Sequence, residues 1–279
     1  MEIFQAIILG IVQGFTEFLP ISSSAHLYLA PRFLRWEDPG LAFDVALHWG
    51  TLLAVLAFFG KDYWRYAKAL FKWTPHLASR QTRGHPLPQG ERENIVADAR
   101  LAWFLILASV PGALFGWLLE DQAATTFRNP LLQAVTLSLM GLILWFADRP
   151  ARPRKSLADI NWKNSLFIGF SQALAIIPGV SRSGATITAG LFSKLDRETS
   201  ARFSFLLSGP IIFGAGLVAL RGLTTINAAL VAGFIASAIS GALAIKFLLK
   251  YLASHNVNLF VWYRLALAVL IVILVVAGM

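Results

Sequence analysis

The sequence predicts an all-α integral membrane protein, from its hydrophobic composition, its low charge and the length of its apolar runs. Of the 279 residues, 57% are hydrophobic and only 14% are charged, whereas about a quarter of the residues in a soluble domain carry charge. Several apolar runs approach the roughly 20 residues that a helix needs to cross a bilayer. Because backbone groups in lipid must be hydrogen-bonded within the segment itself, we expect a helical bundle.

The composition also excludes several classes of protein. The chain contains no cysteine, so a disulfide framework and a thiolate metal site are both impossible. A net charge of +9 would indicate nucleic acid for a soluble protein. Here the basic residues concentrate between apolar runs, where orientation in the membrane explains them better. The N-terminus is not a typical signal peptide, since Glu2 replaces a basic segment and Glu17 follows the apolar run.

Six apolar runs are long enough to span a bilayer. They are residues 41–59, 100–119, 129–147, 203–221, 225–249 and 259–278. Two further runs, 3–15 and 166–177, are too short to cross. Each leads into a proline, a serine-rich stretch and a second short segment, which is 25–34 in the first case and 185–192 in the second. This pattern is typical of a re-entrant hairpin, whose non-helical break must be buried in protein or face water.

The order of these elements predicts an internal repeat. A hairpin and three spans are followed by a second hairpin and three spans, and an odd number of crossings per half places the halves in opposite orientations. The expected parts are one membrane domain over 1–279, an inverted repeat of 1–147 and 148–279, and re-entrant hairpins over 3–34 and 164–193. A short similarity between ASVPGALFG (108–116) and LSGPIIFGAG (207–216) is suggestive support for the repeat.

The distribution of basic residues predicts the orientation. Eighteen of the 24 Lys and Arg residues lie on one side of this topology, in segments 60–100, 148–163, 191–202 and 246–258. Cytoplasmic segments are enriched in Lys and Arg, so both termini are expected outside. The polar residues 74–95, rich in Pro and Gly, are interpreted as an inner loop.

The second hairpin contains PGVSRSGATITAG at 178–190, which has the features of a phosphate-binding loop. Its proline ends the preceding helix, Gly179 and Gly184 permit tight turns, and a new helix is expected from about Ala185. The free N–H groups and the dipole at a helix start favour an anion. Further donors are the guanidinium of Arg182 and the hydroxyls of Ser181, Ser183 and Thr186.

The first hairpin supplies a complementary set of polar groups. They are Gln13, Glu17, Ser22, Ser23, Ser24 and His26. Glu17 lies one turn after Gln13, so both can share a helix face. An acid, hydroxyls and an imidazole in one membrane break, with an arginine-bearing loop in the other, indicate a site.

Each of these groups also has a structural interpretation that stays open. A serine can cap a helix, and His26 can be a hydrogen-bonded core residue. Glu17 can form a buried ion pair with Arg182, and the second loop can be a glycine-rich hinge. An arginine inside a broken membrane helix is costly and usually functional, however, and chance accounts poorly for the whole set.

If the halves are inverted, the two hairpin tips meet near the middle of the membrane. The ligand is then anionic and approaches from the bilayer, and a lipid that carries phosphate meets both conditions. Glu17 and His26 can act as base and acid with a serine as nucleophile, or Glu17 can hold a divalent cation that bridges phosphate oxygens. Asp44 and His48 share one helical face. They either line the approach to this site, support the side chains that form it, or form an ordinary interfacial cap.

At these residues the chain resembles the bacterial undecaprenyl-diphosphate phosphatases of the bacitracin-resistance type. QGFTEFLPISSSAH (13–26) is similar to the first motif of that family and PGVSRSGATITAG (178–190) to the second, and the resemblance covers essentially the whole chain. It implies removal of the terminal phosphate from undecaprenyl diphosphate, which leaves the monophosphate carrier for cell-wall assembly. It further implies action at the outer face of the inner membrane, lower sensitivity to bacitracin, and dependence on a divalent cation, magnesium or calcium.

The resemblance also implies roles for single residues. The matches are Glu17 with the acidic residue of the first motif, Ser23 with its proposed nucleophile, His26 with its histidine, and Arg182 with the diphosphate-binding arginine, between Ser181 and Ser183. Gln13 stands where many members have a second glutamate, which weakens any scheme that needs two carboxylates for a metal. Ala25 stands where many members have glycine. Whether serine or histidine attacks phosphorus stays open.

A polyprenyl-phosphate transporter or flippase is the alternative function, because inverted repeats with broken helices are also typical of transporters. Glu17, Ser23 and His26 favour chemistry, since transport needs no nucleophile. The expected partners are the polyprenyl diphosphate substrate and membrane lipids, with no nucleic acid. A homodimer and the preferred length of the lipid chain are left open.

Overall fold

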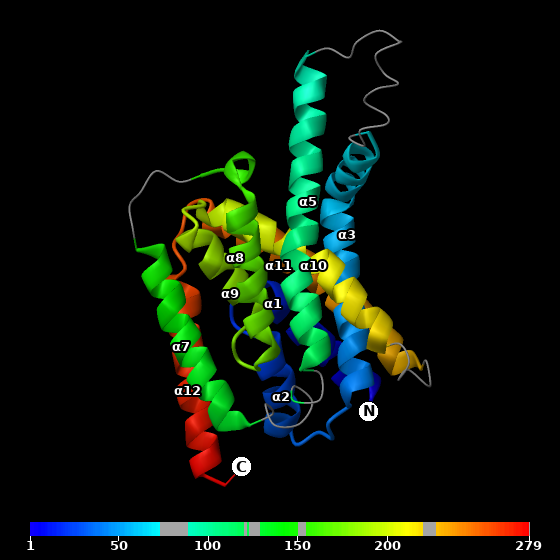
Figure 1. Cartoon of the computed structure of the whole chain (residues 1–279). Coiled ribbons are helices and arrows are strands. Elements are labelled where there is room, and N and C mark those ends of the chain that lie inside the picture. Colours follow the sequence, from blue (N-terminus) through cyan, green and yellow to red (C-terminus); the bar gives the residue numbers. More distant parts are fainter. Residues whose placement is uncertain (73–88, 120–121, 123–128, 150–154, 220–226, 279) are drawn as a thin grey trace.

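The computed structural model of the chain describes residues 1–72, 89–119, 122, 129–149, 155–219 and 227–278 (Figure 1). All regular elements in these ranges are helices. They are α1 (Ile3–Phe18), α2 (Ser23–Leu34), α3 (Leu41–Lys72), α5 (Gln89–Leu118), α7 (Pro130–Asp148), α8 (Trp162–Ala173), α9 (Arg182–Phe192), α10 (Arg197–Ala219), α11 (Ala228–Leu252) and α12 (Asn258–Val276). Single 3-10 turns, η2 (Leu157–Asp159) and η3 (Leu174–Ile176), lie on either side of α8. The all-α prediction is confirmed.

Six of these helices, α3, α5, α7, α10, α11 and α12, are long and apolar enough to cross a membrane. They correspond one to one to the six predicted spans. Many of their large apolar side chains point away from the rest of the protein; Trp117, Trp262 and Val276, for example, are 73%, 68% and 83% exposed. An apolar surface of this extent is suited to contact with lipid, so the prediction of a multi-pass membrane protein is confirmed.

The ends of α3 and α5 correct the predicted bounds. α3 continues to Lys72 instead of ending at 59, and α5 begins at Gln89 instead of 100. The described part of the predicted inner loop 74–95 is therefore helical, and the prediction of a loop there is wrong. Residues 73–88, which make up the rest of that loop, lie outside the described residues.

The extensions of α3 and α5 are held together by ion pairs. The guanidinium of Arg65, on α3, lies 2.9 Å from Asp98 of α5 and 3.2 Å from Asp62. Asp62 also pairs with Arg202 of α10 at 2.8 Å. Hydropathy falls at the membrane surface, but a helix supported by such polar contacts can continue beyond it. This is why the apolar runs underestimate both helices.

Both predicted breaks are present, and their helices are longer than expected. α1 continues to Phe18 instead of ending at 15, α2 begins at Ser23 instead of 25, and α9 begins at Arg182 instead of 185. The residue before each second helix, Ser22 or Ser181, has a left-handed backbone with φ of 75° or 69°. Such a φ is uncommon for a residue other than glycine. It turns the chain directly before each second helix, so these helices begin two or three residues earlier than the starts predicted from the proline and glycine positions.

Helix α1 is anchored mainly by α11. A Cβ atom at Gly14 would lie 1.9 Å from Ser240 Oγ and 2.6 Å from the backbone nitrogen of Gly241. The two backbones can approach this closely because Gly14 has no side chain. Gly14 lies between Gln13 and Glu17 in the sequence, so this contact fixes the part of α1 that carries the predicted acid.

The packing partners follow the pattern of a repeat. If α1–α2 corresponds to α8–α9, and α3, α5 and α7 correspond to α10, α11 and α12, then the pair α1–α11 corresponds to the pair α8–α5. Both pairs pack together, as do α3 with α10 and α7 with α12. Both termini lie at the lower end of the bundle in Figure 1, opposite the long upper ends of α3 and α5. This pattern favours the inverted repeat, which stays a prediction.

The short similarity between 108–116 and 207–216 does not support that repeat. The first segment lies in α5, the second span of its half, and the other segment lies in α10, the first span of its half. These helices are not equivalent in the scheme above. The support comes from the helix order and the packing partners instead.

Candidate active site

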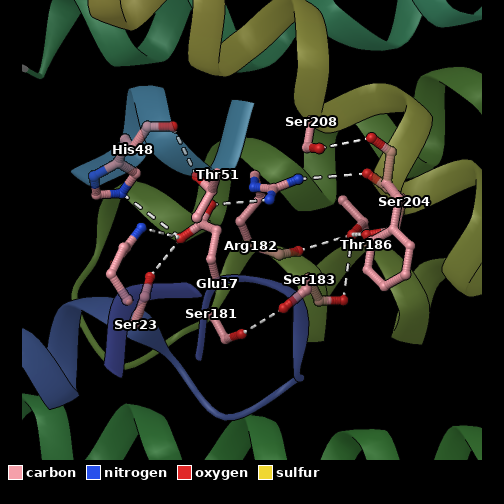
Figure 2. A network of polar contacts seen from close by, with 12 residues as sticks. Glu17, Ser23, His48, Thr51, Ser181, Arg182, Ser183, Thr186, Ser204 and Ser208 are labelled. Carbon is pink, nitrogen blue, oxygen red and sulfur yellow. Dashed lines mark hydrogen bonds and ion pairs between the residues drawn. The ribbon is translucent and has the colours of Figure 1, made fainter. Parts of the chain in front are cut away.

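Glu17 lies at the point where the two breaks meet (Figure 2). Its Oε1 atom accepts a hydrogen bond from Arg182 Nη2 at 2.9 Å, which joins the first break to the second. Its Oε2 atom accepts hydrogen bonds from Ser23 Oγ at 2.7 Å and from Gln13 Nε2 at 3.2 Å. The predicted pairing of Gln13 and Glu17 on one helix face is present, and so is the ion pair with Arg182 that the sequence left open as an alternative.

An imidazole also reaches this carboxylate, and it belongs to His48. Its Nε2 atom lies 3.6 Å from Glu17 Oε2, and its Nδ1 atom lies 2.7 Å from the carbonyl oxygen of Asp44. A ring nitrogen bound to a backbone carbonyl fixes the orientation of the imidazole. Among the interpretations of His48, the structure supports the one in which this residue lines the approach to the site.

A cavity of about 360 Å³ opens in front of these groups. Both breaks line it, together with the beginning of α3 and the last turns of α5 and α10. Its polar lining residues are Glu17, Ser22, Ser23, Ser24, His48, Gln172, Ser181 and Arg182. The starts of α2 and α9 both belong to this lining, and helix N-termini favour anions. Six residues predicted from the two motifs, together with His48, therefore share one anion-favouring cavity.

His26 does not line this cavity. Its Nδ1 atom lies 2.7 Å from the carbonyl oxygen of Ser22, and its Nε2 atom lies 2.6 Å from the Tyr263 hydroxyl. The ring also stacks on that of Tyr263, with centroids 5.6 Å apart. This is the hydrogen-bonded environment of the structural alternative, and the catalytic role of His26 stays a prediction.

Several other predicted binding residues shape the second break and do not line the cavity. Ser183 Oγ donates a hydrogen bond to the carbonyl oxygen of Leu19 at 3.0 Å, which is a second link between the two breaks. Thr186 Oγ1 donates to the carbonyl oxygen of Arg182 at 2.8 Å. Gly179 has a φ of +89°, a conformation that glycine adopts without strain. These residues position Arg182.

The serines that precede the two second helices differ in their contacts. Ser181 Oγ accepts a hydrogen bond from the backbone nitrogen of Gly184 at 3.1 Å and so caps α9. Within the described part of the chain, Ser22 makes no side-chain capping bond to α2. Its Oγ atom lies 3.1 Å from Ser24 Oγ instead. The capping interpretation is therefore confirmed for Ser181. It does not hold for Ser22, which lines the cavity together with Ser23 and Ser24.

Arg264, on α12, is a buried residue that the motif analysis missed. Its guanidinium is fully buried and donates hydrogen bonds of 2.9–3.1 Å to the carbonyl oxygens of Pro20, Leu137, Gly179 and Val180. It therefore binds the backbone of both breaks. A Cβ atom at Gly184 would lie 2.7 Å from Arg264 Nη1, which explains the need for glycine there. The sequence signal that could have identified it is an arginine within the last apolar run, because a charged residue there is usually functional.

The side chains present can hold a divalent cation only with help from a ligand. The described residues contain no group of three or more His, Asp or Glu side chains that could hold a metal ion. Magnesium is often bound by one or two carboxylates together with substrate phosphates. Glu17 fits this mode, and the Gln13 side chain beside it has a buried Oε1 atom without a hydrogen-bond partner among the described residues.

The fold and the cavity define a class of protein: multi-pass helical membrane proteins in which two breaks between short helices line one anion-favouring cavity. Within that class, the chain belongs to the bacitracin resistance protein BacA family, whose model matches residues 6–270. An undecaprenyl-diphosphatase of Moorella thermoacetica is 54% identical to it, with 98% of this chain and 97% of that protein covered. Relatives of the same name from Pelotomaculum thermopropionicum and Desulforudis audaxviator are 49% and 46% identical, over 99% and 98% of this chain and 98% of each relative. The resemblance seen in the two motifs is confirmed.

Proposed function

We propose that this protein hydrolyses undecaprenyl diphosphate to undecaprenyl phosphate and inorganic phosphate. The observation that carries the proposal is the contact of Glu17 with Ser23 and Arg182 at a cavity that both breaks line. The relatives named undecaprenyl-diphosphatase support the choice of substrate. The reaction recycles the lipid carrier for peptidoglycan synthesis, and the family description supports a role in bacitracin resistance.

Arg182 is the residue that we assign to bind the terminal phosphate. Its guanidinium is mostly buried, holds Glu17 through Nη2 and lines the cavity. A guanidinium has five N–H donors, so Arg182 can keep its bond to Glu17 and still donate to phosphate oxygens. The N-terminus of α9, at which Arg182 is the first residue, favours the same negative charge.

Ser23 is the residue that we assign as nucleophile. Its Oγ atom donates to Glu17 Oε2 at 2.7 Å, so Glu17 can take the proton as Oγ attacks the terminal phosphorus. The bond between that phosphorus and the bridging oxygen breaks, undecaprenyl phosphate leaves, and the proton is released from Glu17. Water then attacks the phosphoserine; Glu17 takes a proton from the water and returns it to Ser23 Oγ as inorganic phosphate leaves. His26 fits this role less well because both of its ring nitrogens have partners.

The lipid chain can lie beside the polar cavity. An apolar cavity of about 500 Å³ lies between α5, α7, α8 and α9, and Ile176 lines both cavities. α9 extends from Arg182 in the polar cavity to Ala189 and Phe192 in the apolar one. Burial of one methylene group contributes about 0.8 kcal/mol, so a prenyl chain can gain affinity there without polar contacts.

We also propose that a divalent cation, magnesium or calcium, takes part in the reaction. Glu17 would hold it together with phosphate oxygens of the substrate. When bound, the cation would neutralise part of the phosphate charge and make phosphorus easier to attack. The single carboxylate at this position agrees with a cation that the enzyme binds only together with its substrate.

The inner membrane is the location that we propose, with both termini and the cavity facing the periplasm. The excess of Lys and Arg in the segments on the opposite side supports this orientation. His48 near the start of α3 and Gly116 near the end of α5 line the cavity, and these helix ends lie toward the termini in Figure 1. The cavity can then be reached from the side where peptidoglycan assembly releases the diphosphate. A homodimer stays a prediction.

Phosphate release from undecaprenyl diphosphate by the purified protein in detergent tests the proposal. Release is expected with magnesium and not with a chelator, and both Glu17→Ala and Arg182→Ala should lose it. A flippase for polyprenyl phosphates is the second candidate, favoured by the repeat-like packing of the helices. Wild-type protein that is folded and binds the lipid, but releases no phosphate with either cation, would replace the hydrolase with the flippase.

A further inference from the structure

Gln172, near the end of α8, is a buried polar residue without a hydrogen-bond partner among the described residues. Its side chain lines the polar cavity and is 4% exposed. Neither Nε2 nor Oε1 has a hydrogen-bond partner among the described residues. Buried polar atoms are nearly always hydrogen-bonded, because an unpaired one is costly. Two unpaired atoms on one amide at a cavity wall therefore point to a partner that enters the cavity.

The neighbours of Gln172 hold its amide at the cavity wall. A Cβ atom at Gly112, on α5, would lie 2.7 Å from Gln172 Nε2, so the amide packs directly against the backbone of α5. Gly112 lines the same cavity. The absence of a side chain at Gly112 provides the space for the amide without giving it a hydrogen-bond partner.

The predicted repeat relates Gln172 to Glu17. The sequences GFTE at 14–17 and GFSQ at 169–172 lie in α1 and α8, the helices that lead into the two breaks. In the predicted repeat, Gln172 is therefore the counterpart of Glu17 in the second half. The first half presents a carboxylate, which can accept a proton, and the second half presents a neutral amide, which can donate to an anion without repelling it.

The position of Gln172 indicates which part of a lipid diphosphate it can contact. The next residues in the chain, Ala173, Leu174 and Ile176, line the apolar cavity, whereas Arg182 lies at the polar site with Glu17. Gln172 is thus close to the place where the two cavities adjoin. A lipid whose chain occupies the apolar cavity brings the phosphate that carries the chain to this place.

We propose that Gln172 binds the lipid-linked phosphate of the substrate, with Nε2 donating a hydrogen bond to a phosphate oxygen. This inference rests on the proposed function and extends it, because it separates the site of the lipid-linked phosphate from that of the terminal phosphate at Arg182. Undecaprenyl phosphate, the product, retains the phosphate that Gln172 contacts and lacks the one that Arg182 contacts.

Gln172→Leu tests this assignment, since leucine has a similar size and no polar atoms. KM for undecaprenyl diphosphate is expected to rise by about 10- to 100-fold, as for the loss of a hydrogen bond to a charged group. Competitive inhibition by undecaprenyl phosphate should weaken by a similar factor, whereas inhibition by inorganic phosphate should not change. The midpoint of thermal unfolding should stay the same or rise, because two unpaired buried atoms are removed.

Two further variants control this experiment. Gly112→Ala should displace the amide and raise KM in the same direction. Gln133→Leu, on α7, is the matched control, because Gln133 also has a buried, unpaired Oε1 atom among the described residues but does not line this cavity; its KM should not change. An unchanged KM and unchanged inhibition by undecaprenyl phosphate in Gln172→Leu would overturn the inference, as would equal weakening of inhibition by inorganic phosphate.

The assignment of Gln172 can be tested independently of the proposed hydrolysis. Direct binding of undecaprenyl phosphate to wild type and Gln172→Leu needs no turnover. Loss of binding in the variant supports the inference even if wild type releases no phosphate. Equal binding by the two proteins overturns it even if wild type is an active phosphatase.

Discussion

Glu17 is the residue on which the most contacts of the site converge. Arg182, Ser23 and Gln13 all donate hydrogen bonds to its carboxylate, and His48 Nε2 lies 3.6 Å away. A buried carboxylate with this many donors is held in one orientation. A change to Glu17 is therefore expected to affect both the proposed base and the placement of the proposed nucleophile, Ser23.

Glu17→Gln is expected to lower kcat by about 10²- to 10⁴-fold, the range for loss of a general base. Ser23→Ala should remove turnover and also remove a phosphoserine that can be trapped by rapid acid quench with phosphate-labelled substrate. Thermal unfolding midpoints check that both variants are folded. If Ser23→Ala kept its turnover while His26→Gln lost it, the nucleophile would have to be reassigned to His26.

Arg264 is expected to be the most important single residue for the position of the breaks. Arg264→Gln should lower the free energy of unfolding by about 3 kcal/mol or more, because buried carbonyl oxygens lose their donors. Arg264→Lys should lose less, since it keeps a donor. Gly184→Ala should also destabilise, and its effect should not add to that of Arg264→Gln, because the new Cβ atom meets the group that is removed.

Thermal unfolding followed by tryptophan fluorescence measures these effects, since the chain has nine tryptophans. An unfolding midpoint of Arg264→Gln equal to that of wild type would show that the four carbonyl oxygens do not depend on the guanidinium. Full additivity of the two changes would show that Gly184 and Arg264 do not act on each other.

At the scale of elements, the two breaks share one backbone conformation, a serine with a positive φ directly before the second helix. Ser22 and Ser181 both have a positive φ and both precede a helix that opens into the cavity. The left-handed region costs a residue with a Cβ atom roughly 1–2 kcal/mol. Such strain is found most often at functional sites, where the surrounding structure enforces it.

Ser22→Gly is therefore expected to raise the free energy of unfolding by about 0.5–1 kcal/mol, after allowance for the greater freedom of glycine in the unfolded chain. Ser181→Gly should gain less, because it also loses the hydrogen bond from Gly184 to Ser181 Oγ. The midpoints of thermal unfolding of the two variants, measured in the same detergent, show which substitution stabilises the protein more. A larger gain for Ser181→Gly would contradict the difference in capping between the two breaks.

At the scale of the whole molecule, the ten α-helices of the described residues form one bundle in which the two breaks meet. The termini lie at one end, and the polar extensions of α3 and α5 lie at the other (Figure 1). The cavity opens among helix ends that lie toward the termini. The orientation of the bundle in the membrane therefore decides from which side a soluble phosphate can leave.

The lack of native cysteine makes this orientation directly measurable. Gly278→Cys, near the C-terminus, is expected to react with a membrane-impermeant maleimide in intact spheroplasts. Lys72→Cys, at the end of the α3 extension, should react only after the membrane is opened. The reverse labelling pattern would place the termini in the cytoplasm and contradict the orientation derived from the basic residues.

The fold class and the spans followed from the sequence because they depend on local composition. Membrane length and hydropathy identify six spans, and a proline with serines after a short apolar run identifies each break. Glu17 and Arg182 were found in the same way, because polar groups in an apolar setting stand out. These signals need no knowledge of which helices touch.

The tertiary structure decided which of these groups meet. His48, and not His26, lies near Glu17, although His26 is closer in sequence. Arg264 reaches the breaks from 244 residues after Pro20. The amide of Gln172, which has no hydrogen-bond partner among the described residues, packs against Gly112 of another helix. The sequence by itself determined the class of fold, the spans and the polar residues of the two breaks. Only the packing of distant helices determined the partners of those residues. Hydropathy is a property of a single segment, whereas a hydrogen bond between helices depends on the positions of two segments.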